Sequence, residues 1–107
     1  YQYWGDQPRE DWMFLEYGDL DVWARSTSNI VWSNGELDPW RKGGVNANLS
    51  DTLIAVQVPN AGHHVDLFFS REEDTDEILA AREVEIQNMM IWKDNRRQSV
   101  ASFTAMQ

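Results

Sequence analysis

The strongest constraint in this chain is the run Ser33–Trp40, which directly follows a short apolar segment. Apolar and polar residues do not alternate in that segment, which is typical of a strand buried on both faces of a sheet. It predicts a strand over about 29–33. Asn34-Gly35 tolerates left-handed backbone angles and indicates a turn. Pro39 then pushes Asp38 into an extended conformation. The pattern predicts a carboxylate on a stiff loop just past the end of a buried strand.

A second strand and loop follow further along the chain. Residues 52–58 are rich in β-branched side chains and predict a strand, and a turn then leads to His63. The interval 34–51 is long enough for a crossover between parallel strands. A helix over about 75–95 completes the order strand, Asp loop, strand, His loop, helix. This order indicates the C-terminal part of an α/β-hydrolase fold, whose triad runs Ser, Asp, His along the chain.

Asp38 and His63 are the candidate catalytic residues. A buried carboxylate can orient an imidazole, which then acts as general base and general acid. The residues alone leave other readings open. Asp38 could simply cap its own loop, and His63 could be a histidine satisfied in a loop, with His64 as its rival. Neighbours in extended backbone point opposite ways, so we expect only one histidine to face a nucleophile.

A metal site would have to use His63, His64 and Asp66, and their spacing fits no helical or hairpin zinc site. We therefore expect no metal and no cofactor, and we expect Asp66 to brace the loop. The chain has no cysteine, which removes disulfides and thiolate ligands.

The wording Ser33-Asn34-Gly35-Glu36-Leu37-Asp38-Pro39-Trp40, followed by His63-His64-Val65-Asp66-Leu67, resembles the prolylcarboxypeptidase family of serine peptidases, which includes Pro-X carboxypeptidases and dipeptidyl peptidases. The resemblance runs from about Gln2 to about Trp92 and covers only the C-terminal end of a family member. It implies that Asp38 and His63, the first of the paired histidines, belong to a Ser-Asp-His triad. It also implies a peptide substrate with proline near the scissile bond and a lysosomal or secreted protein.

The nucleophile is expected upstream, because the sequence contains no Gly-x-Ser-x-Gly motif. The first residue is Tyr1, and neither a signal peptide nor a membrane-length apolar run is present, so we expect a fragment. Alone, it should be inactive and either marginally stable or oligomeric, with the rest of the parent chain as its partner; a homodimer stays open. The net charge of −9 argues against nucleic-acid and anionic-membrane partners.

Several local expectations concern the rest of the chain. Residues 9–17 predict a short helix, and 19–28 a loop. Asp74, with Glu77 three residues later, predicts a capping box for the long helix. We expect one domain portion over 1–97 and a disordered tail over 98–107. Asn48-Leu49-Ser50 is a candidate N-glycosylation site.

Two other functions remain possible from the sequence. A homologue that has lost its serine would act as a secreted binding or structural protein. A carbohydrate-binding module would use some of the six tryptophans. Because the tryptophans are spread along the chain, packing is the more usual explanation for them.

Overall fold

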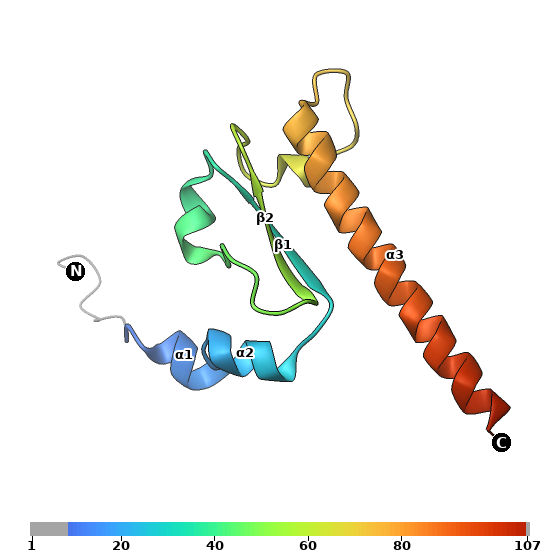
Figure 1. Ribbon diagram of the computed structural model, residues 1–107. Helices are drawn as coiled ribbons and strands as arrows, with labels where there is room; N and C mark the ends of the chain where they lie inside the picture. The colour runs from blue at the N-terminus through green and yellow to red at the C-terminus, as the bar shows by residue number, and fades with distance from the viewer. Residues whose placement is uncertain (1–8, 107) are drawn as a thin grey trace.

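The computed structural model describes residues 9–106, in which helices flank a two-stranded sheet (Figure 1). The elements are α1 (Trp12–Tyr17), α2 (Leu20–Ser26), β1 (Ile30–Gly35), the 3-10 helix η1 (Pro39–Gly43), β2 (Leu53–Val58), the 3-10 helix η2 (Val65–Leu67) and α3 (Asp76–Ala105). Residues 1–8, where the family resemblance begins, lie outside the described residues. Within 9–106, none of the helices is long and apolar enough to cross a membrane.

The sheet consists of β1 and β2, which run parallel with Ile30 opposite Leu53 and Gly35 opposite Val58. Parallel strands need a crossover connection, and here the connecting chain passes through η1. Because both strands point the same way, the loops that follow them leave the same edge of the sheet (Figure 1). The parallel strands and the long C-terminal helix confirm the predicted α/β class.

A small apolar core joins the end of β2 to the start of α3. Val58 is 0% exposed, and together with Ala61 it packs against Ile78 and Ala81 of the helix. Val65 of η2 packs on the same cluster. Since Ala61 and Val65 lie on either side of the paired histidines, this core fixes the chain at both ends of the histidine loop.

The C-terminal half of α3 extends away from the sheet (Figure 1). Several large apolar side chains along α3 are exposed, namely Ile86, Met89, Met90, Ile91 and Phe103. The rest of the parent chain, expected from the sequence as a partner, stays a prediction, and we expect it to cover these side chains.

The N-terminal segment differs from the expectation. The predicted helix over 9–17 begins later, at Trp12, and ends before Gly18, whose φ of 82° suits glycine. The predicted loop over 19–28 is wrong, because it contains α2. The Asp19 carboxylate starts this helix by accepting a hydrogen bond from the Val22 amide at 3.0 Å. Asp19 is thus the N-cap of a helix that was not predicted from the sequence.

The bounds of α3 also differ. Its N-cap is Thr75, whereas the predicted cap, Asp74, uses its carboxylate to bind the Arg71 amide and Arg82. The helix continues to Ala105, through most of the predicted tail over 98–107. In that tail, each of three hydroxyl groups donates a hydrogen bond to the backbone carbonyl four residues earlier; they belong to Ser99, Ser102 and Thr104.

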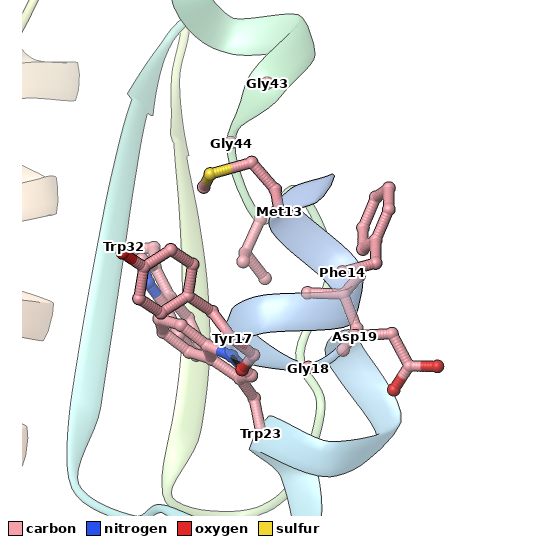
Figure 2. A pocket seen from close by; sticks show the side chains of 11 residues that line it. Met13, Phe14, Tyr17, Gly18, Asp19, Trp23, Trp32, Gly43 and Gly44 are labelled. Atoms are coloured by element: carbon pink, nitrogen blue, oxygen red, sulfur yellow. Dashed lines mark hydrogen bonds between the residues drawn. The ribbon is translucent and has the colours of Figure 1, made fainter. Parts of the chain in front are cut away.

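A groove of about 330 Å³ lies between the two short helices and β1. Figure 2 shows the rings of Tyr17, Trp23 and Trp32 gathered in it, with Met13 nearby. The indole N–H of Trp23 donates to the Tyr17 carbonyl at 3.2 Å. Trp23 and Trp32 are therefore half-buried residues that line the groove between the short helices and the strand.

Candidate active site

Asp38 lies on the loop between β1 and η1, in the extended backbone conformation that Pro39 imposes (φ −76°, ψ 119°). One carboxylate oxygen, Oδ1, accepts a hydrogen bond from the Trp40 amide at 2.9 Å and caps η1. The sequence posed loop capping and histidine orientation as alternatives. The structure combines them, because the other oxygen, Oδ2, is left to meet His63.

His63 reaches Asp38 from the neighbouring loop. Its Nδ1 lies 2.7 Å from Asp38 Oδ2. An ionised carboxylate only accepts hydrogen bonds, so Nδ1 carries the proton and Nε2 is the nitrogen able to accept one. The Asp38 side chain is 9% exposed and that of His63 is 55% exposed. The pair thus presents an accessible imidazole backed by a covered carboxylate.

The surroundings favour the charged form of Asp38. The hydrogen bond from His63 and the one from the Trp40 amide lower the pKa of Asp38, and together they outweigh the opposite effect of burial. An ionised partner in this position stabilises a positive imidazole when the ring takes up a proton.

Backbone contacts hold the two loops together. The Glu36 amide donates to the Val58 carbonyl and the Leu37 amide to the Ala61 carbonyl, both at 2.9 Å. The loops approach so closely at Gly35 that a Cβ there would overlap the Gly62 carbonyl oxygen. Glycine at position 35 is therefore required by space.

His64 occupies an unexpected conformation. Its φ of 38° lies in the left-handed region, so the backbone at the paired histidines is not extended. The two imidazole rings consequently do not point opposite ways, and their centroids are 3.9 Å apart. The His64 ring also meets the edge of Phe68, with centroids 5.5 Å apart. The His64 ring therefore packs between the rings of His63 and Phe68.

Asp66 is buried in η2, with 4% of its surface exposed. The segment around it is held by Arg82 of α3. This guanidinium donates to the backbone carbonyls of Asp66 at 2.7 Å and Phe68 at 3.1 Å, and it also binds the Asp74 carboxylate. The brace expected of Asp66 is therefore made largely by its backbone.

Sequence reasoning missed Arg82 and Glu85, the charged residues of α3 nearest this loop. A signal was present, because both continue the buried stripe of Ile78 and Ala81 at helical spacing. Charged residues on a buried stripe need partners, and Arg82 finds them in η2, at Phe68 and at Asp74.

Asn48 is exposed, and its side-chain oxygen accepts a hydrogen bond from the Ala55 amide at 2.8 Å. Its glycosylation stays a prediction. Within residues 9–106, no group of three or more His, Cys, Asp or Glu side chains is arranged to hold a metal ion.

Comparison with known proteins adds the family. The family model for Serine carboxypeptidase S28 matches residues 6–85. Lysosomal Pro-X carboxypeptidase of Homo sapiens is 42% identical over 92 residues, which cover 86% of this chain and 18% of that protein. The protein of that name from Mus musculus is 42% identical over 89 residues, covering 83% of this chain and 18% of that protein.

A more distant relative shares the same region. Prolyl carboxy peptidase like protein 5 of Caenorhabditis elegans is 39% identical over 77 residues, covering 69% of this chain and 15% of that protein. The chain therefore spans less than a fifth of the length of these relatives. With its parallel strands, its long C-terminal helix and this match over most of its length, the chain belongs to the serine carboxypeptidase S28 family.

Proposed function

We propose that this chain supplies the Asp and His of a Ser-Asp-His triad to a serine-type exopeptidase that cleaves next to proline. The observation that carries the proposal is the 2.7 Å contact between His63 Nδ1 and Asp38 Oδ2 at the edge of a parallel sheet. The names of the relatives favour a carboxypeptidase that acts on Pro-X bonds in the lysosome, over a dipeptidyl peptidase or a secreted enzyme.

In the proposed reaction, the serine hydroxyl comes from outside this chain. Nε2 of His63 takes the serine proton as the oxygen attacks the substrate carbonyl, and it later returns that proton to the leaving amine. Asp38 keeps the imidazole in the required tautomer and stabilises the positive ring. Hydrogen-bond donors for the oxyanion also have to come from the rest of the enzyme.

The test uses a longer protein that contains this chain together with a Gly-x-Ser-x-Gly segment. We expect a fluorophosphonate reagent to label that serine, and a peptide ending in Pro-X to lose its last residue. Asp38→Asn and His63→Ala should each lower kcat by roughly 10⁴-fold. Asp51→Asn, at an exposed acid in a turn, is the matched control and should leave kcat unchanged.

Two outcomes would contradict the proposal. A folded protein whose serine is not labelled would favour the non-catalytic homologue. Labelling and hydrolysis that survive His63→Ala would move the general base to another residue. The 107-residue chain alone should hydrolyse no peptide, because it carries no Gly-x-Ser-x-Gly nucleophile.

A further inference from the structure

The chain just after the paired histidines contains a buried carboxylate, Asp66, one oxygen of which has no hydrogen-bond donor within residues 9–106. Asp66 is 4% exposed, and its Oδ2 atom is buried with no hydrogen-bond donor among the described residues. A buried polar atom that has given up water and found no donor destabilises the folded state. Asp66 Oδ2 therefore needs a hydrogen-bond donor, and no N–H group in the described part of the chain provides one.

The group that can supply this proton is Glu85 of α3. Glu85 lines one pocket together with Ser33 of β1 and Leu67, the neighbour of Asp66 in η2. Side-chain hydrogen bonds with Asp66 and Ser33 both act on the pKa of its carboxyl. Two carboxylates in contact repel each other, so such a pair retains one proton between them. That proton would give Asp66 Oδ2 its donor, and the Ser33 hydroxyl would donate to the other oxygen of Glu85.

The charged groups around Glu85 come from two elements. Asp66 of η2 faces it, and Arg82 lies one turn earlier on α3, while β1 contributes only the neutral Ser33. Burial, followed by the contact with Asp66, raises the pKa of Glu85 to about 7, and Arg82 acts in the opposite direction. The carboxyl group is therefore protonated in acid and ionised in weak alkali.

The location of this pair gives it a consequence. η2 begins immediately after His64 and lies against the first turns of α3 (Figure 1). Arg82 holds the backbone of this segment through carbonyl groups, and a guanidinium keeps its charge at every relevant pH. The contact between Asp66 and Glu85 is a second attachment of the same segment, and it is the one that depends on a proton.

We propose that Glu85 is a positioning residue: by sharing a proton with Asp66 it holds η2, and through η2 the imidazole of His63, in acid and releases them as the proton is lost. The inference about the loop is independent of the reaction. Its effect on hydrolysis rests on the function proposed above.

The direction of the effect follows from linkage. The carboxyl of Glu85 titrates near 4.5 when unperturbed and at about 7 in the folded chain. Between these values the folded state binds more protons than the unfolded state, so stability falls as pH rises through this window. Above about pH 7 this contribution is lost.

Hydrogen–deuterium exchange of the segment 63–68 tests the proposal directly, in the longer protein that contains the chain. After correction for intrinsic exchange, wild-type protection should fall about tenfold between pH 5 and pH 8. Glu85→Gln replaces the titrating group by an amide that donates to Asp66 at every pH. Its protection should be the same across the range.

A matched control is Glu83→Gln, an exposed acid on the same helix, which should keep the wild-type pH dependence. Asp66→Asn approaches the pair from the other side. Its amide donates to ionised Glu85 and removes the repulsion between the two carboxylates, whereas the burial of Glu85 remains, so the fall of protection with pH should shrink. This variant decides the matter if Glu85→Gln does not fold. An undiminished pH dependence in either folded variant would overturn the proposal.

Activity separates this proposal from the proposed function. We expect kcat/KM of the wild type to fall as the pH rises through about 7. This fall should flatten in Glu85→Gln, while kcat at pH 5 stays close to wild type. If the enzyme hydrolyses peptides but segment 63–68 exchanges independently of pH, the positioning role fails and the peptidase assignment stands. If no hydrolysis occurs but Glu85→Gln removes the pH dependence of exchange, the positioning role stands and the peptidase assignment fails.

Discussion

Arg82 of α3 donates a hydrogen bond of 2.7 Å to the backbone carbonyl of Asp66, three residues after His63. This contact links the helix to the histidine loop without using any side chain of that loop. The orientation of the imidazole therefore depends on a residue that neither the Asp nor the His motif contains.

Replacing Arg82 should loosen this link. Lysine keeps the charge but cannot reach two carbonyls and a carboxylate with one ammonium group. We expect Arg82→Lys to lower the free energy of unfolding by roughly 2 kcal/mol, the scale of hydrogen bonds to a charged donor. Denaturant unfolding measures this value. Arg97→Lys, at an exposed position of the same helix, is the control and should unfold like the wild type.

Gly35 should tolerate no side chain. A Cβ at this position would overlap the Gly62 carbonyl and force the two loops apart. We expect Gly35→Ala to destabilise the fold by roughly 2 kcal/mol, as overpacking does, and to lower activity as well. Gly43→Ala is a matched control, since nothing lies within 4 Å of a Cβ there. Equal stability of the two variants would contradict the close approach of the loops.

Asp38 should titrate below its ordinary value of 3.8. A depressed pKa in the folded state stabilises the fold above pH 3.8, and this contribution is lost as the pH falls through the lower folded value. Carbon-13 NMR of the carboxyl measures the titration. In His63→Ala no side chain remains to donate to Asp38, so the main cause of the shift is gone and the pKa of Asp38 should move back toward 3.8. An unchanged pKa would show that His63 is not the cause.

The cap of α2 gives a prediction far from the site. Asp19→Ala removes the acceptor for the Val22 amide and should cost about 1 kcal/mol of stability. Asp19→Ser keeps an oxygen in reach and should restore most of the loss. Thermal unfolding of the two variants checks the difference, and identical melting temperatures would speak against the cap.

The sequence was enough to predict the order of strands and loops, and to bring Asp38 and His63 together. This succeeded because parallel strands place their following loops at one edge, whatever the details of packing. The two residues also lie in short loops whose backbone is set locally, by Pro39 for the first and by the turn before the second.

Features that depend on distant contacts could not be predicted in this way. Asp74 looked like a helix cap, but Arg82, a full two turns later, offered its carboxylate a better partner. His64 adopts a left-handed backbone, which no local propensity of histidine favours. The contacts of Glu85 with Asp66 and Ser33 bring together α3, η2 and β1, so no single stretch of sequence predicts them.

The two oxygens of Asp38 have different partners, the Trp40 amide and His63, and this determines how an amide at position 38 would behave. The Trp40 amide can only donate, so in Asp38→Asn the side-chain carbonyl must turn to it and the NH₂ must turn to His63. Nδ1 would then have to accept, and the ring proton would move to Nε2, where it blocks uptake of another. The backbone N–H of Trp40, which is in place before any substrate binds, thereby determines which nitrogen of the imidazole is basic.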